Sequence, residues 1–371
     1  MGLTVGTGGA IMPPVETLIK TAKRAEERGY HAIWWPDHWM GWHPESIWTP
    51  DVGEIASYVP SPHIYLDPIA AMAAAAVHTE RIRLGTSVTE PLRRHPALLA
   101  HEWISLDHIS KGRMILGIGA GEAENNEPYG IDYSKQVSKL EEALEIVRLL
   151  WSTTEKVDFK GQFWTLRDAV CGLGPYGDAP PPIWVGALGP RMLDICGRLG
   201  DGWMPTIMMP PEVWSARFDA VKASASRAGR DTSAFDACVY ALTIVAETHE
   251  EAHRLLDTPI PKGYCLVASH ETFEEYGGEH PFGPDFYGIR DYIPTRVGRE
   301  EGLRAIEKIP FEVAHAFTAH GTPDELAAMA REYEARGATH LVLQNLTPLA
   351  APAQTGPSFR LLDAVVAALR D

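Results

Sequence analysis

The residues with the clearest capacity for chemistry lie in the segment 114–130, where an apolar run ends in alternating glycines and meets a carboxylate. The run 114–118 has the composition of a parallel strand that is buried on both faces. Three glycines at alternate positions leave bare backbone on which a flat ligand can lie: Gly117, Gly119 and Gly121. Glu122 is the first functional group beyond them, and Asn125 follows on the next turn. The segment therefore predicts that Glu122 lies at the edge of a pocket, at the end of a buried strand.

These glycines do not form a dinucleotide-binding fingerprint. That motif needs G-x-G-x-x-G, whereas here the third glycine comes one residue early and Glu122 stands at the expected glycine position. A negative charge there would repel a pyrophosphate. A purely structural interpretation stays open, in which the glycines permit close packing and Glu122 caps the N-terminus of a helix.

A second candidate group follows the predicted strand 32–35, which runs directly into Asp37 and His38. A histidine at a strand end suits proton transfer because its pKa lies near neutral pH, and Glu122 would be the complementary acid or base. The alternative is a histidine held by structural hydrogen bonds. His43 lies five residues further on in a loop, too loosely placed to argue for zinc, so we expect no metal site. The sequence also lacks a G-x-S-x-G turn, which leaves hydrolysis with little support.

The elements that would position these groups alternate as strand and helix along the chain. Strands are expected at 3–8, 32–35, 81–88, 114–118, 182–188, 202–207, 237–245 and 340–346. Eight such units predict an α/β fold, a (β/α)8 TIM barrel in one domain spanning 1–371. Insertions are expected around 39–66, 154–180 and 259–320, at the C-terminal face, the last of them covering the pocket mouth. In such a barrel, chemistry lies at the C-terminal ends of the strands.

Composition narrows the class of protein. The chain has 371 residues with 45% hydrophobic and 22% charged residues, which is ordinary for a globular enzyme. Its net charge of -16 argues against nucleic-acid binding, so small molecules are the expected partners. No apolar run approaches the ~20 residues of a membrane span, and the N-terminus does not read as a signal peptide. We therefore expect a cytoplasmic protein. Four widely spaced cysteines are expected to be reduced and mostly buried thiols.

Three motifs together resemble the luciferase-like oxidoreductases, in the branch that uses the deazaflavin coenzyme F420. They are Trp35-Pro36-Asp37-His38, Leu84-Gly85-Thr86-Ser87-Val88 and Gly117-Ile118-Gly119-Ala120-Gly121-Glu122. The likeness covers most of the chain and extends to F420-dependent glucose-6-phosphate dehydrogenases and methylenetetrahydromethanopterin reductases. The segments 119–130, 189–193 and 285–294 are nearest to those of the mycobacterial phthiodiolone ketoreductases.

The resemblance implies a role for each matching residue. His38 would be the acid/base at the substrate oxygen, and Glu122 would lie near the N1 edge of the deazaflavin as proton donor or stabiliser. A non-prolyl cis peptide is implied between Ser87 and Val88. Glu90 replaces a family threonine after the third strand, so the resemblance leaves open whether it contacts cofactor or substrate; it is placed with the cofactor-binding residues. These are Asp37, Ser87, Val88, Glu90, Ala120, Gly121, Asn125, Leu188, Gly189, Arg191 and Met192.

One departure from the family bears on the substrate. The sugar-phosphate dehydrogenases hold phosphate with lysines after the sixth strand, whereas this chain has an apolar segment at 204–209. An apolar alcohol or ketone therefore fits better, with substrate contacts expected from Trp42, Trp48, Met208 and Met209. The implied reaction is hydride transfer between C5 of F420 and a carbinol or carbonyl carbon. Alternatives are an FMN-dependent monooxygenase and a non-catalytic flavin-binding protein, and family habit suggests a homodimer.

Overall fold

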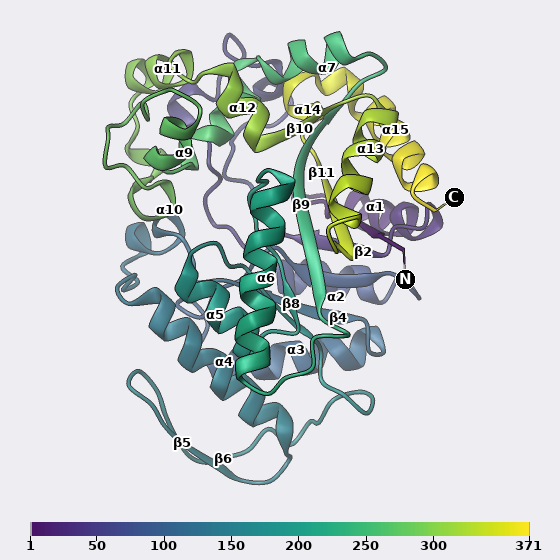
Figure 1. The fold of residues 1–371 in the computed structure, drawn as a ribbon, viewed down its shortest axis with the longest axis vertical. Coiled ribbons are helices and arrows are strands. Elements are labelled where there is room, and N and C mark those ends of the chain that lie inside the picture. Colours follow the sequence, from purple (N-terminus) through teal and green to yellow (C-terminus); the bar gives the residue numbers. More distant parts are fainter. Residues whose placement is uncertain (1, 371) are drawn as a thin grey trace.

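Eight parallel strands close into a barrel in the computed structural model, which describes residues 2–370 (Figure 1). The strands are β1 (Thr4–Gly8), β2 (Ala32–Trp35), β3 (Arg83–Thr86), β4 (Met114–Ile118), β7 (Ile183–Val185), β8 (Gly202–Trp203), β9 (Asp236–Val245) and β11 (His340–Asn345). They pair in the order β9-β11-β1-β2-β3-β4-β7-β8, and the pairing of β8 with β9 closes the ring. Each of them lies within or across one of the strands expected from the sequence, so the TIM-barrel prediction is confirmed.

Eight helices form the outer layer, one after each barrel strand. They are α1 (Val15–Glu27), α2 (Pro68–Ala76), α3 (Pro96–Ser110), α4 (Gln136–Ser152), α5 (Pro190–Leu199), α6 (Pro211–Arg227), α13 (Pro323–Glu334) and α15 (Thr355–Ala368). In α1, Leu18, Ala22 and Ala25 recur at helical spacing and are buried against the barrel. Asp67 begins α2 by accepting hydrogen bonds from the first free backbone N–H groups. Packing against the barrel and capping of the first turn therefore hold these outer helices in place.

The barrel interior is filled by large side chains. Trp34 and Trp184 pack with ring centroids 4.9 Å apart, and Trp34 Nε1 donates to His340 Nε2 over 3.1 Å. Gly6 makes room for them, because a Cβ there would meet both Trp34 and His340 at 2.7 Å. Burial on both faces explains why these strands read as continuous apolar runs. The site is thus supported from below by a packed core.

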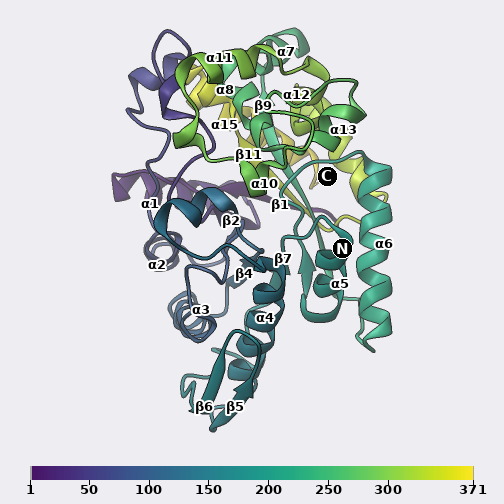
Figure 2. The same ribbon diagram turned by 90° about the vertical axis from the view of Figure 1, so that its left-hand side faces the viewer.

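The segment 39–66 forms the first insertion, with short 3-10 turns η1 (Glu45–Ile47) and η2 (Glu54–Ser57). The segment 154–180 contains the hairpin of β5 (Val157–Lys160) and β6 (Thr165–Ala169). This hairpin follows α4 and lies at the opposite end of the molecule from the helices of the third insertion (Figures 1 and 2). Because it lies between the end of α4 and the start of β7, the hairpin is at the N-terminal ends of the strands, so its expected place at the C-terminal face is wrong and it has no part in the pocket.

The long excursion after β9 begins with α7 (His249–Leu256) and is mostly helical. It continues through α8 (Pro259–Gly263), η5 (Tyr264–Val267), α9 (His270–Glu275), α10 (Gly288–Asp291), η6 (Pro294–Arg296), α11 (Arg299–Glu307) and α12 (Phe311–Phe317). A strand that the sequence did not predict, β10 (Thr318–Gly321), then pairs with the second half of β9. The remaining elements are η3 (Ala123–Asn125), η4 (Glu127–Tyr129), α14 (Thr347–Ala350) and η7 (Pro352–Gln354).

Two further expectations concern the chain as a whole. All four cysteines are free and buried, as predicted. Among residues 2–370, no helix combines the length and the apolarity needed to cross a membrane.

Candidate active site

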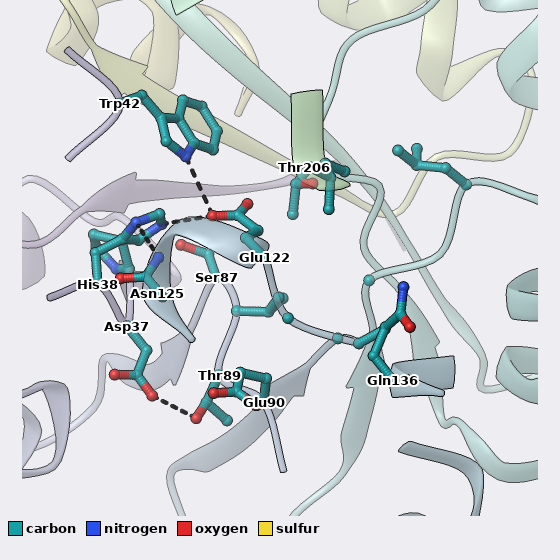
Figure 3. Close-up of a pocket in the computed structure, with 18 of the residues that line it drawn as sticks. Asp37, His38, Trp42, Ser87, Thr89, Glu90, Glu122, Asn125, Gln136 and Thr206 are labelled. Atoms are coloured by element: carbon teal, nitrogen blue, oxygen red, sulfur yellow. Dashed lines mark hydrogen bonds and ion pairs between the residues drawn. The ribbon is translucent and has the colours of Figure 1, made fainter. Parts of the chain in front are cut away.

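A pocket opens at the C-terminal ends of the barrel strands, where its walls surround about 1450 Å³ of space that is partly open to solvent (Figure 3). The segments that follow β2, β3, β4 and β7 supply most of its wall. Of the residues predicted from the sequence, the wall includes Asp37, His38, Trp42, Ser87, Val88, Glu90, Ala120, Gly121, Glu122, Asn125, Leu188, Gly189 and Met192. The third insertion contributes Tyr264, Tyr287 and Ile289, so it does form part of the pocket.

His38 is held through its Nδ1 atom. The Asn125 side chain accepts backbone N–H groups of Trp39 and Met40 through its oxygen, which fixes its nitrogen as a donor. Nδ1 of His38 lies 3.0 Å from the Met40 carbonyl oxygen, 3.1 Å from Glu124 Oε1 and 3.0 Å from Asn125 Nδ2. The Asn125 nitrogen also donates to Glu124 Oε1 over 3.1 Å. The Met40 carbonyl can only accept, which favours a proton on Nδ1. Nε2 lies 3.8 Å from Glu122 Oε2, on the pocket side.

The charge around His38 favours its protonated form. Burial alone lowers the pKa of the imidazole, but the negative charge of Glu122 and the hydrogen bond to Glu124 outweigh it. The net effect raises the pKa of His38 to about 9. At neutral pH, His38 is accordingly an imidazolium with an N–H available to a bound ligand.

Glu122 is fixed by an aromatic donor from the first insertion. Trp42 Nε1 donates to Glu122 Oε2 over 3.2 Å, and the two side chains point toward each other (Figure 3). Glu122 precedes η3 but its side chain makes no capping hydrogen bond there, so the helix-cap interpretation is wrong. Trp42 therefore holds a carboxylate, and its predicted contact with substrate stays a prediction.

Glu124 is a functional candidate that the sequence reasoning missed. It lies in η3, two residues after Glu122, and its side chain is 2% exposed. Burial raises the pKa of its carboxyl to about 8, although the hydrogen bond with His38 lowers it, and the charge of Glu122 adds to the rise. A proton on Glu124 at neutral pH leaves the cluster with one cation, His38, beside two carboxyl groups. Only its spacing from Glu122 could have drawn attention to it.

The glycines that follow one another at alternate positions have two functions: two of them allow close strand packing, and one forms part of the pocket wall. A Cβ at Gly117 would meet the backbone of Thr86 at 1.8 Å, and one at Gly119 would meet Val88 at 2.8 Å. These two glycines therefore let β3 and β4 pack closely against each other, as the purely structural interpretation of the glycines predicted. Gly121 has a φ of +85° and lies in the pocket wall. The peptide bond between Ser87 and Val88 is cis, as the family resemblance implied.

An ion-pair network lies beneath the wall on the β2 and β3 side. Arg93 donates to Glu90 over 2.6 Å and to the backbone oxygen of Asp37 over 2.5 Å. The Asp37 carboxylate accepts from Thr89 Oγ1 at 2.6 Å and also pairs with Arg94 (Figure 3 shows the Thr89 contact). Glu90 therefore has a structural partner in Arg93 as well as a place on the pocket wall. Arg93 itself lines the pocket and was not predicted.

Four predicted residues lie outside this pocket. Arg191 reaches Ser138 and Glu141 on α4, at 2.9 and 3.1 Å. Trp48 is buried in a small cluster beneath the first insertion and donates to the Val59 carbonyl over 2.7 Å, so its prediction as a substrate contact is corrected. Met208 and Met209 line a second cavity, which shares four wall residues with the pocket: Leu188, Gly189, Tyr287 and Ile289.

Other wall residues were missed because their segments carry no motif. They include Ile11, Tyr65, Tyr133, Gln136, Thr206, Tyr240, Leu242 and Gln344. Several are tyrosines of the kind that sequence alone cannot separate from core residues. Ligand atoms of His38, Glu122 and Glu124 also lie within 4.8 Å of one another, a spacing open to a cation, so the absence of a metal stays a prediction.

Comparison with known proteins identifies the family. Residues 2–340 match the family model described as luciferase-like monooxygenase. The chain belongs to this family. It is 35% identical to the phthiodiolone/phenolphthiodiolone dimycocerosates ketoreductase of Mycobacterium sp. (strain JLS), over 90% of this chain and 89% of that protein.

Two further matches extend the comparison. The F420-dependent glucose-6-phosphate dehydrogenase of Kineococcus radiotolerans is 29% identical over 86% of this chain and 84% of its own. Among solved structures, an F420-dependent secondary alcohol dehydrogenase in complex with an F420-acetone adduct superimposes with a TM-score of 0.77 over 100% of both chains. Its 21% identity supports the fold alone.

Proposed function

We propose that this protein is an F420-dependent oxidoreductase that transfers a hydride between C5 of the deazaflavin and the carbon of an apolar secondary alcohol or ketone. His38 exchanges the proton at the substrate oxygen. The observation that carries the proposal is the position of His38, an imidazolium on the pocket wall whose Nδ1 is held from behind and whose Nε2 lies on the pocket side. The names of the ketoreductase and dehydrogenase relatives support the same class of reaction.

The pocket offers partners for a flat heterocycle with polar edges. Within residues 2–370, two wall residues have a buried polar atom without a hydrogen-bond partner, Arg93 Nη1 and Gln344 Oε1, and a third such atom, Asp37 Oδ1, has only an ion pair with Arg93 at 3.4 Å. Such atoms are costly unless a ligand pairs them. Gly189 precedes α5, and a Cβ there would meet nothing within 4 Å, so this helix N-terminus is open to an anionic side chain of the coenzyme. Ser87, Val88, Ala120 and Gly121 would hold the ring.

Bound F420 supplies the hydride chemistry, and the protein supplies orientation and the proton. In the direction of reduction, Nε2 of His38 donates a proton to the carbonyl oxygen as negative charge develops there. Glu122, 3.8 Å from Nε2, favours the imidazolium before transfer. The contacts of Nδ1 with Met40 and Glu124 keep the ring oriented throughout. In the direction of oxidation, neutral His38 accepts the proton instead.

The charge of the wall favours an uncharged substrate. Among the described wall residues, Arg93 is the only lysine or arginine; its Nε donates to Glu90, and in this proposal its free Nη1 serves the coenzyme. Asp37, Glu90 and Glu122 add carboxyl groups, so a substrate phosphate would be poorly held. Aromatic rings from Trp42, Tyr65, Tyr240 and Tyr264 supply apolar surface. The adjoining cavity also has Arg217, Glu271 and Glu275 in its wall, but its apolar side, formed by Ile207, Met208, Met209 and Phe317, offers room for an apolar extension of the substrate.

Parallel fluorescence titrations with oxidised F420 and with FMN test the cofactor. We expect micromolar or tighter binding of F420 and weaker binding of FMN. Preference for FMN, with oxygen-dependent turnover, would replace the proposal with a monooxygenase. Reduced F420 is then offered a series of methyl ketones of increasing chain length, and oxidation of the coenzyme is followed by absorbance. Binding with no turnover on any ketone or secondary alcohol would instead indicate a non-catalytic deazaflavin-binding protein.

A further inference from the structure

Four histidines meet where α7, α12 and β10 pack together, away from the pocket described above. His249 and His253 lie on α7, His315 on α12 and His320 on β10. None of the four lines the pocket or the adjoining cavity. The excursion after β9 thus brings together histidines that are separated by up to about 70 residues of chain.

The ring nitrogens converge at the spacing of a metal site. His249 and His253 are four residues apart, which places them on one face of α7. One ring nitrogen from each of His249, His253 and His320 lies within 4.8 Å of the other two. Three imidazole nitrogens that bind a tetrahedral metal at about 2.0–2.1 Å lie ~3.4 Å apart, so the rings must close in by up to ~1.4 Å to hold an ion. Rotation of the two exposed side chains on α7 can supply that change.

The nitrogens of His320 lack ordinary partners. Its Nδ1 faces Nδ1 of His315 at 3.3 Å, so that one imidazole is the closest polar neighbour of another. Its Nε2 is buried and has no hydrogen-bond partner among the described residues. A buried imidazole nitrogen without a partner is costly, and coordination to a cation satisfies it.

A carboxylate completes the arrangement from outside. Glu325 of α13 places Oε1 3.1 Å from Nδ1 of His249, while its Oε2 accepts the backbone N–H of Thr322 over 2.8 Å. The capping box of α13 therefore holds the carboxylate in place. A proton on Nδ1 of His249 leaves the lone pair on Nε2. Histidines that bind metals commonly donate their other ring N–H to such a carboxylate.

We propose that His249, His253 and His320 bind a divalent transition metal of the kind that imidazole ligands suit, such as zinc, with His315 beside them and Glu325 orienting His249. The ion would tie α7 to β10 and so fasten the excursion that carries part of the pocket wall. Its role is structural, and the proposal is independent of the reaction in the pocket.

Metal binding by tag-free protein tests this site. Zinc affinity is measured by competition with a chromophoric chelator, and cobalt is added separately because its visible spectrum reports tetrahedral coordination. We expect one equivalent of tightly bound zinc that raises the midpoint of thermal unfolding. His253→Ala and His320→Gln should each weaken binding at least ~10-fold. Both variants are checked for native circular dichroism.

Two controls make the result specific. His101→Ala removes an exposed helical histidine from α3 and should leave zinc binding unchanged. His38→Asn removes the other cluster with metal-compatible spacing and should also leave it unchanged. The proposal is overturned if no stoichiometric binding occurs at micromolar zinc. It is equally overturned if binding survives in folded His253→Ala and His320→Gln, or disappears in His38→Asn.

Discussion

His38 and His43 lie five residues apart after β2, and both are largely enclosed, yet their surroundings shift their pKa values in opposite directions. Glu122 and Glu124 raise the pKa of His38 to about 9. Burial lowers the pKa of His43 to about 4, because its only compensation is a hydrogen bond of 2.7 Å to the Ile260 carbonyl oxygen. Neighbouring carboxylates, rather than burial, decide which buried histidine is charged.

The two histidines consequently serve different ends. His43 packs against the rings of Trp48 and Tyr264 and lies against Gly263, where a Cβ would meet it at 2.8 Å. It joins the first insertion to the third and so holds the pocket wall together. His38 begins the same loop but presents its ring to the pocket. One loop therefore contains a site for proton transfer and, a few residues on, its structural anchor.

Replacing His38 gives the largest expected effect. His38→Asn should lower kcat for ketone reduction by about 10²- to 10⁴-fold, because the proton donor at the substrate oxygen is lost. Affinity for F420, measured by fluorescence, should change little. Steady-state kinetics with an unchanged kcat would show that His38 is a structural residue like His43.

The charge of Glu122 should set the pH dependence of the reaction. Ketone reduction needs protonated His38, so its kcat/KM should fall above about pH 9. Alcohol oxidation needs neutral His38, so its kcat/KM should rise as the pH approaches about 9. Glu122→Gln removes a charge that raises the pKa of His38, so the pH profiles of reduction and of oxidation should both move to lower pH. Glu124→Gln is the matched second variant. If the pH profile of kcat/KM does not move in either variant, a group other than His38 sets the pH dependence.

Truncation of His43 should affect stability rather than chemistry. His43→Ala should lower the free energy of unfolding by ~2–4 kcal/mol, because it removes a buried ring and leaves the Ile260 carbonyl unpaired. The folded pKa of about 4 lies below the unfolded value, so the contribution of His43 is present at neutral pH and is lost as pH falls from about 6.5 to about 4. Urea denaturation of wild type and variant at several pH values measures the difference. A loss of kcat at full stability would contradict the division of roles.

The two tryptophans of the first insertion give a smaller contrast. Trp42→Phe keeps the aromatic surface but removes the hydrogen bond to Glu122, so we expect a change of ~2- to 10-fold in kcat/KM. Trp48→Phe, which loses the bond to the Val59 carbonyl outside the pocket, should alter stability and leave kcat/KM near wild type. The same kinetic assay serves both variants. Equal kinetic effects would show that the insertion acts as one unit.

The barrel strands and the site residues at their ends could be predicted because they follow from the local pattern of apolar and polar residues. The barrel strands are buried on both faces, which produces apolar runs that end in polar groups, and His38 and Glu122 lie at two such ends. β10 escaped prediction because Thr318–Gly321 is short and carries a histidine and a glycine. Its pairing with β9 depends on tertiary structure.

The errors at the site have a different cause. Trp42 and Trp48 lie in the same loop and look equivalent in sequence, but only the fold decides which one faces the pocket. Glu124 was missed because its burial, and hence its pKa, arises from contacts with a loop 86 residues away. Cytoplasmic location and a homodimer stay predictions.

Histidine NMR titration of the cofactor-free protein tests the central claim most directly. The chain has 15 histidines, and His38→Asn identifies the signal of His38 by its disappearance. We predict that His38 titrates near pH 9 and that Glu122→Gln moves its pKa downward. A pKa at or below the ordinary value of about 6.5, or one that Glu122→Gln does not move, would contradict the account of His38 as the charged proton donor.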